Sequence, residues 1–298
     1  MPSAQSVGLR EFLRSQFAAS DPAETIQQIR ERVDGSMLRL PVLAGTQVEP
    51  FSAKGITGDW VSMPGAATDR VLLYLHGGAY VMGSARTHRD LAARLSRAAG
   101  VRVLVPNYRL APENPYPAAI EDVVAVYGWL LEQGFKPEHI AIGGDSAGGN
   151  LAVVALLALC EAGVALPAAA ILLSPWTDLT LSGESVTTRA AVDPMIRLGE
   201  AREQFAYYVG NHDPASPLIS PIFADLHGMP SLLIHVGNDE VLLDDSVRLA
   251  ERAQAAGTAV EIKVWEGMWH VFQSLAGILP EGQASIDELG AFVKHHLF

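Results

Sequence analysis

The chain has 298 residues, of which 49% are hydrophobic and 18% are charged. This composition supports a large buried core and excludes an intrinsically disordered protein. Twenty-one Lys and Arg against 33 Asp and Glu give a formal charge of −12, which argues against nucleic acid and anionic membrane surfaces as partners, because both require basic footprints. The single cysteine, Cys160, cannot form an internal disulfide.

The chain is not expected to insert into a membrane. Charged side chains occur in the first 17 residues where a signal peptide would have its apolar region. The longest apolar run, from Leu151 to Cys160, is about half as long as a membrane-spanning helix. We therefore expect a soluble protein, and a cytoplasmic location agrees with the cysteine content.

The first forty residues are predicted to be helical. Apolar residues recur there at spacings of three and four, at Leu9, Phe12, Leu13 and Phe17 and again at Ile26, Ile29 and Val33. Between the two groups, Asp21-Pro22 fits a helix cap followed by a proline in the first turn.

Further along, short apolar runs alternate with helical patterns. Runs typical of strands cover 56–63, 71–75, 101–105, 140–142, 170–173, 232–236 and 260–264. Helical patterns cover 88–99, 118–133, 147–162, 245–256 and 285–297. Apolar strands interleaved with helices predict an α/β fold with a mostly parallel central sheet, covered by helices on both faces.

One long segment interrupts this alternation. Residues 177–229 contain several prolines and helical patches but no clear strand, and an insertion of this length in an α/β core is usually functional. We therefore predict a cap over the carboxyl edge of the sheet. The predicted division is an N-terminal helical cap segment (1–45), a catalytic core (46–176 and 230–298) and a cap insertion (177–229).

The pentapeptide Gly144-Asp145-Ser146-Ala147-Gly148 is the only G-x-S-x-G in the chain. A predicted strand leads into it and a predicted helix leads out, which is the setting of a nucleophile elbow. The two outer glycines would let strand and helix cross closely. Ser146 is thus a candidate nucleophile, and the helix N-terminus below it favours a developing negative charge. The alternative interpretation is an ordinary glycine-rich connection.

A second motif, His76-Gly77-Gly78-Ala79-Tyr80, follows another predicted strand. Small residues at such a position let main-chain N–H groups approach a ligand, as in an oxyanion hole. On its own the motif could be a Gly-Gly turn with a histidine at a strand end. Because both motifs follow strands in the expected order, together they favour catalysis.

A nucleophilic serine needs a histidine base and a carboxylate that orients it, and in hydrolases with a nucleophile elbow the chain order is serine, acid, histidine. His270 follows the 260–264 strand at the correct edge of the sheet. Other histidines downstream of Ser146, which fit strand, turn or helix positions, include His227, His235, His295 and His296. The acid is expected after the 232–236 strand, where Asp239 is preferred and Glu240 is the next candidate. Asp145 is expected to hold the turn locally.

Five segments together resemble a known family. They are HGGAY (76–80), NYRLAPENPYPAAIED (107–122), GDSAGG (144–149), GNDEVLLDD (237–245) and MWH (268–270). In this combination the chain, from about residue 71 onward, is similar to the hormone-sensitive-lipase-like (bacterial family IV) carboxylesterases. The resemblance implies an α/β-hydrolase fold, a mobile N-terminal cap, and hydrolysis of short-chain esters without metal or cofactor.

By the same resemblance, Ser146 is the nucleophile, Asp239 the acid and His270 the base of a catalytic triad. The oxyanion hole is formed by Gly77, Gly78, Ala79 and Ala147, with Gly77 shaping the loop. His76 is expected to brace this loop without transferring protons.

Two positions depart from the family pattern. Ala79 stands where the family has the third glycine of HGGG, so its N–H is retained but a methyl group enters the pocket and narrows access on the alcohol side. The acid segment reads Asp239-Glu240-Val241 where many relatives have Asp-Pro-Leu.

Three further side chains, Tyr80, Trp176 and Met195, are candidates for lining the acyl pocket, although such residues are more often core. The expected function is that of a serine carboxylesterase acting on short- to medium-chain acyl esters through an acyl-enzyme. The alternatives are a lactone or carbohydrate-acetate hydrolase, a non-catalytic small-molecule receptor and a serine peptidase. The expected partner is a small-molecule ester, and a homodimer is plausible by analogy with relatives.

Overall fold

The computed structural model describes residues 2–18, 24–39 and 41–298. The predicted helix cap at Asp21-Pro22 lies outside the described residues. The described chain forms one eight-stranded sheet in the order β1-β2-β4-β3-β5-β6-β7-β8. The strands are β1 (Gln47–Ala53), β2 (Ile56–Ser62), β3 (Ala67–Leu75), β4 (Val101–Asn107), β5 (Ile140–Asp145), β6 (Ala169–Leu173), β7 (Ser231–Gly237) and β8 (Val260–Trp265).

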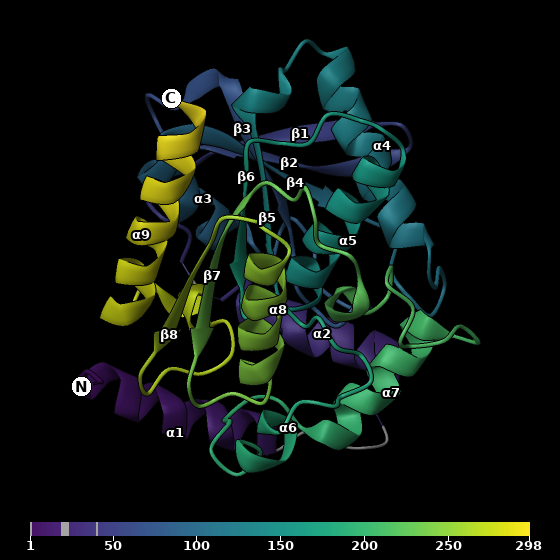
Figure 1. The fold of residues 1–298 in the computed structure, drawn as a ribbon. Helices are drawn as coiled ribbons and strands as arrows, with labels where there is room; N and C mark the ends of the chain where they lie inside the picture. Colours follow the sequence, from purple (N-terminus) through teal and green to yellow (C-terminus); the bar gives the residue numbers. More distant parts are fainter. Residues whose placement is uncertain (1, 19–23, 40) are drawn as a thin grey trace.

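Helices flank this sheet on both faces (Figure 1). The α-helices are α1 (Ala4–Ala18), α2 (Ile26–Met37), α3 (Arg89–Ala99), α4 (Ala118–Glu132), α5 (Ala147–Glu161), α6 (Ser185–Thr188), α7 (Leu198–Val209), α8 (Leu243–Ala255) and α9 (Pro280–Leu297). Short 3₁₀ turns are η1 (Pro137–His139), η2 (Pro221–Phe223) and η3 (Phe272–Leu275).

The sheet is mostly parallel, as predicted. Strands β4, β3, β5, β6, β7 and β8 pair in parallel, and only β2 pairs antiparallel with its neighbours β1 and β4. The sequence did not single out β1. Its side chains are mostly exposed and it contains Pro50, both of which suit an edge strand, so it lacks the apolar pattern of the inner strands.

Two apolar clusters fill the space between sheet and helices. Within β3, Leu73 and Leu75 pack on the side of α4, α5 and α8, whereas Leu72 and Tyr74 pack on the side of α3 and α9. Successive side chains of a strand point to opposite faces, so a strand buried on both sides must be apolar at every position. This explains the continuous apolar runs in the sequence.

The carboxyl ends of the parallel strands are covered by helices from two distant parts of the chain. Figure 1 shows α1, α2, α6 and α7 gathered at one end of the molecule. Between β6 and β7 the chain forms only α6, α7 and η2. The boundaries of the predicted cap and core stay a prediction, as does the homodimer. In the described ranges, no helix combines the length and apolarity needed to cross a bilayer.

The crossing of α5 over the sheet is unusually close. A Cβ atom added to Gly148 would lie 2.0 Å from the carbonyl oxygen of Leu75, and one added to Gly144 would lie 2.3 Å from the carbonyl oxygen of Gly148. These separations are shorter than van der Waals contact. The prediction that both glycines allow strand and helix to cross closely is thus confirmed.

The variant Gly148→Ala is expected to lower the free energy of unfolding by about 1–3 kcal/mol, because the added methyl overpacks a backbone crossing. Gly128→Ala is the matched control: Gly128 also lies in a helix, and a Cβ there meets nothing within 4 Å. That variant should gain about 0.5–1 kcal/mol from helix propensity. Urea unfolding of both variants checks this, and equal stability changes would contradict it.

Candidate active site

Ser146 is the single residue between β5 and α5. Its backbone has φ 54° and ψ −121°, a conformation that costs a non-glycine residue about 1–3 kcal/mol. Hydrogen bonds from the neighbouring strand and loop hold it there: the Ser146 N–H donates to Leu173 O at 2.9 Å, and the Trp176 N–H donates to Ser146 O at 3.0 Å. This is the geometry of a nucleophile elbow.

The loop after β3 turns through three successive residues with positive φ. These are Gly78 (124°), Ala79 (52°) and Tyr80 (64°). In the described part of the chain, no hydrogen bond within the protein occupies the N–H groups of Gly78 and Ala79, and both residues line the cavity next to Ser146. They are therefore available as oxyanion donors.

The other two expected oxyanion residues differ from this pair. The Gly77 N–H donates to Asp145 Oδ1 at 3.1 Å, so it shapes the loop and is not free to bind an oxyanion. Ala147 is the first residue of α5, where an N–H has no acceptor within the helix. Its side chain is fully buried, so only its backbone can contribute to the site.

The carboxylate beside His270 belongs to Glu240. His270 Nδ1 lies 3.2 Å from Glu240 Oε1, and the Glu240 side chain has no exposure to solvent. The second oxygen, Glu240 Oε2, accepts hydrogen bonds from the Ser174 hydroxyl at 2.8 Å and the Gly237 N–H at 3.0 Å. A buried carboxylate is tolerated when its oxygens are satisfied in this way.

The expectation that Asp239 contacts the imidazole is corrected by these contacts. The Asp239 N–H donates to Met268 O at 3.0 Å, while its carboxylate forms an ion pair with Arg10 at 2.7 Å and is 21% exposed. Spacing from the strand could not separate two adjacent carboxylates. The apolar residues Val241 and Leu242, which are buried, directly follow Glu240. This apolar pair was the feature of the sequence that could have indicated that Glu240 is buried.

The environment of His270 shifts its basicity. Burial lowers the pKa of His270, but the hydrogen bond to Glu240 and the negative charge of that residue raise it, and the net pKa lies above the usual 6.5. A general base must be neutral to accept a proton. The raised pKa makes the imidazole a stronger base, but as the pH falls His270 becomes protonated, and unable to act as a base, at a higher pH than an ordinary histidine.

Asp145 has a separate role beneath the oxyanion loop. Its Oδ1 accepts the Tyr74 hydroxyl at 2.9 Å and lies 3.3 Å from His88 Nε2, in addition to the Gly77 contact. Burial raises the pKa of Asp145, but the charge of His88 and these hydrogen bonds lower it below the usual value. As expected, Asp145 is a local support and does not contact His270.

His76 braces the same loop. Its Nδ1 lies 2.9 Å from Gly77 O, and its ring stacks on Tyr108 with centroids 4.2 Å apart. Burial and the nearby His88 lower the pKa of His76 to about 3. The ring is therefore neutral at physiological pH, which agrees with a bracing role.

The four other downstream histidines considered above lie away from the site. His235 is buried in β7, where Nδ1 lies 2.7 Å from the Ser285 hydroxyl. His295 and His296 lie in α9, and His227 lies in the turn before β7. None of these four residues lines the Ser146 cavity, whereas His270 does.

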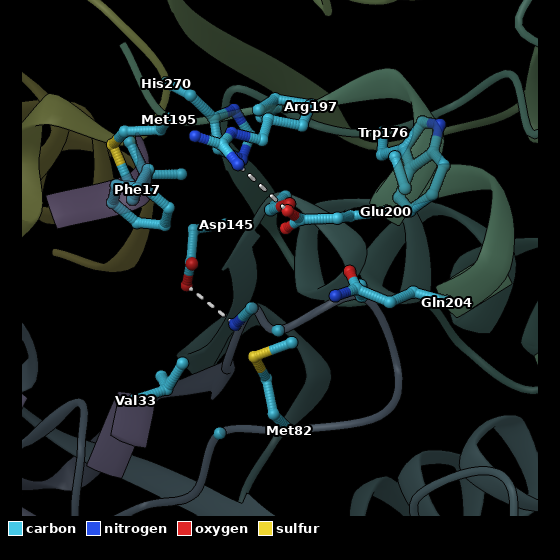
Figure 2. A pocket seen from close by; sticks show the side chains of 18 of the residues that line it. Phe17, Val33, Met82, Asp145, Trp176, Met195, Arg197, Glu200, Gln204 and His270 are labelled. Carbon is cyan, nitrogen blue, oxygen red and sulfur yellow. Dashed lines mark hydrogen bonds and ion pairs between the residues drawn. The ribbon is translucent and has the colours of Figure 1, made fainter. Parts of the chain in front are cut away.

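The cavity has a volume of about 260 Å³ and is lined by Ser146, His270 and the oxyanion loop. Figure 2 shows Phe17 of α1 and Val33 of α2 on one side of it and Trp176 on the other. Trp176 and Met195 line it, and their contact with an acyl chain stays a prediction. Tyr80 does not: it is 1% exposed, stacks on Tyr208 and donates to Asn150 Oδ1 at 2.6 Å, so it is a core residue.

Sequence reasoning missed Ser174, which lies directly after β6 and has φ 46°. Its hydroxyl donates to Glu240 and also accepts the Val271 N–H at 3.2 Å. The residue thus joins Glu240 to the segment that carries His270. Its position at the carboxyl end of a strand was the signal that could have identified it. Among the described residues, no group of three or more His, Cys, Asp or Glu is arranged to hold a metal ion.

Comparisons with known proteins identify relatives of the chain. A family model described as the alpha/beta hydrolase fold matches residues 72–274. An acetyl-hydrolase of Streptomyces hygroscopicus is 48% identical over 238 residues, covering 80% of this chain and 79% of the relative. An esterase of Acinetobacter venetianus is 37% identical over 247 residues, covering 83% and 81%.

Solved structures extend the likeness to the whole chain. The crystal structure of an esterase from the bacterial hormone-sensitive lipase family superposes with a TM-score of 0.96 at 45% identity, over 100% of both chains. The fold, the elbow and the extent of these matches together show that the chain belongs to the hormone-sensitive-lipase-like group of the α/β-hydrolase family and is a carboxylic ester hydrolase.

Proposed function

We propose that the chain is a serine carboxylesterase that hydrolyses short- to medium-chain acyl esters through Ser146, His270 and Glu240. The observation that carries this proposal is the buried contact between His270 Nδ1 and Glu240 Oε1 at 3.2 Å, because His270 lines the same cavity as Ser146 at the elbow. A base oriented by a buried carboxylate is what activates a serine hydroxyl.

In this mechanism, the Ser146 hydroxyl attacks the ester carbonyl and His270 Nε2 accepts its proton, while Glu240 stabilises the imidazolium. The oxyanion that forms on the carbonyl binds the N–H groups of Gly78, Ala79 and Ala147, a contribution of about 3–4 kcal/mol per donor. His270 then protonates the leaving alcohol. It next activates the water that hydrolyses the acyl-enzyme.

The cavity supports a small substrate. Its volume of about 260 Å³ lies just below the roughly 300–1,000 Å³ typical of small-molecule sites. Such a volume favours short acyl chains over long ones. The relative named an acetyl-hydrolase favours an acetyl ester as a second candidate, and this includes a carbohydrate acetate. A lactone would use the same residues.

The variant Ser146→Ala should lower kcat by about 10⁴-fold or more, because no other group in the site can form the acyl-enzyme. A series of p-nitrophenyl esters from acetate to palmitate measures this, and the wild type should prefer the short members. Thermal unfolding of the variant serves as the control for folding. Substantial residual turnover would refute the proposal.

The variant Glu240→Gln should lower kcat by about 10³–10⁴-fold, since the amide no longer stabilises the imidazolium. Burial then dominates the pKa of His270, so the acid limb of the kcat/KM profile should move to lower pH. Asp239→Asn is the matched comparison and should lower kcat by no more than about tenfold. If the Asn variant lost as much activity as the Gln variant, Asp239 would be the acid.

The variant Ala79→Gly should raise kcat/KM for esters of branched alcohols relative to esters of ethanol, because it removes the methyl group that lines the cavity. Glycine also relieves the positive φ of 52°, by about 1–2 kcal/mol. The greater freedom of the unfolded chain offsets about 0.4–1 kcal/mol of this gain, so stability should change little. An unchanged ratio of the two activities would show that the methyl group does not restrict the alcohol side.

A further inference from the structure

Helix α1 contacts the active-site region through one arginine. The guanidinium of Arg10 lies 2.7 Å from Asp239 Oδ2, donates to Gly267 O at 2.6 Å, and donates to Val192 O at 3.4 Å. Its Cζ also lies 5.7 Å from the ring centroid of Trp269. A single side chain therefore joins the segment after β7, the segment after β8 and the insertion between β6 and β7.

Two of these segments carry the proposed acid and base. Asp239 is adjacent to Glu240, and Gly267 lies in the turn that leads to His270. The segments also bind each other, because the Asp239 N–H donates to Met268 O at 3.0 Å and the Gly267 N–H donates to Asn238 Oδ1 at 2.7 Å. Arg10 bonds to both on their outer side.

The start of α1 is packed against the same turn. A Cβ atom added to Gly267 would lie 2.2 Å from Pro2 Cγ, and Gly267 has φ 69°. The Ser3 hydroxyl donates to Glu281 Oε2 at 2.9 Å, which fixes the helix start to α9. The position of Arg10 is thus supported by contacts that the residues before it make with the core.

We propose that Arg10 is a positioning residue, which holds the segments bearing Glu240 and His270 in the spacing that their hydrogen bond requires. This inference rests on the proposed function. Arg10 is not among the residues that line the cavity, so it acts through the two segments and not on the substrate. Its ion pair also keeps the Asp239 carboxylate turned outward, which leaves Glu240 as the carboxylate next to the imidazole.

Arginine suits this role better than lysine. Its planar guanidinium presents several N–H donors in a fixed arrangement, so it can bind a carboxylate and a carbonyl at the same time. Lysine offers a single ammonium on a flexible stem. Arg10→Lys should therefore keep the ion pair to Asp239 but weaken the bond to Gly267.

The same helix provides a matched control. Arg14 lies one turn after Arg10 and donates to Val192 O at 3.2 Å and Ala191 O at 3.5 Å. Both acceptors lie in the insertion, and neither belongs to the segments that carry Glu240 or His270. Arg14→Met thus removes a similar helix-to-insertion contact and leaves the proposed triad supports intact.

The experiment compares Arg10→Met, Arg10→Lys, Arg14→Met and Asp239→Asn in the full chain with p-nitrophenyl butyrate. Arg10→Met should lower kcat about tenfold with KM changed less than about twofold, because a small displacement of catalytic groups can reduce rate by up to about 10²-fold. Arg10→Lys should recover part of the loss, and Arg14→Met should stay within about twofold of the wild type.

The pH profile separates positioning from a merely structural role. In Arg10→Met, a weaker Glu240–His270 contact should lower the pKa of His270, so the acid limb of the kcat/KM profile should move to lower pH. The shift should have the same direction as in Glu240→Gln but be smaller. The double variant Arg10→Met/Asp239→Asn should lose little more than Arg10→Met alone, since the two residues act together. Thermal unfolding defines a temperature at which every variant is folded.

Three results would overturn the inference: an unchanged acid limb in Arg10→Met, a loss confined to KM, or an equal loss in Arg14→Met. None of these results bears on the proposed function, which is tested by the activities of Ser146→Ala, of Glu240→Gln and of Asp239→Asn relative to Glu240→Gln. If Arg10→Met is too unstable to assay, the pH profiles of Arg10→Lys and Asp239→Asn test the inference instead. A shift of their acid limb to lower pH supports it, and an unchanged acid limb overturns it.

Discussion

A carboxylate without solvent exposure lies behind the imidazole of His270, and the arrangement of the site depends on keeping it there. Removing such a charge from water is costly unless hydrogen bonds replace its hydration. Glu240 obtains them from Ser174, Gly237 and His270, which lie at the ends of β6 and β7 and after β8. The acid is therefore stable only if three strands end in the correct register.

The parallel sheet provides that register and also tolerates local strain. Leu173 pairs with His235 and Gly237 pairs with Trp265, which brings the strand ends together at one edge. At that edge Ser146, Ser174 and Val271 have φ of 54°, 46° and 47°. Each such residue costs about 1–3 kcal/mol, and the backbone bonds of Ser146 to Leu173 and of Ser174 to His235 hold two of them in place. The strained turns direct their side chains toward the site.

Much of this arrangement could be predicted from the sequence, because it follows from rules that act locally. Apolar runs identified the inner strands, and the glycines around Ser146 identified the elbow. His270 was found by asking which histidine follows a strand at the correct edge. Where side-chain direction decides, the same rules fail: Tyr80 follows the oxyanion motif, but its side chain turns into the core.

The choice between Asp239 and Glu240 shows why the failure is physical. Both are carboxylates in one irregular turn, so neither residue type nor spacing distinguishes them. What distinguishes them is their partners, since Asp239 meets Arg10 at the surface and Glu240 meets buried donors. Arg10 lies in α1, outside residues 72–274 that the family model matches. The spacing of the acid from its strand therefore does not assign it, and the residue that holds the competing carboxylate outward comes from the N-terminal helix.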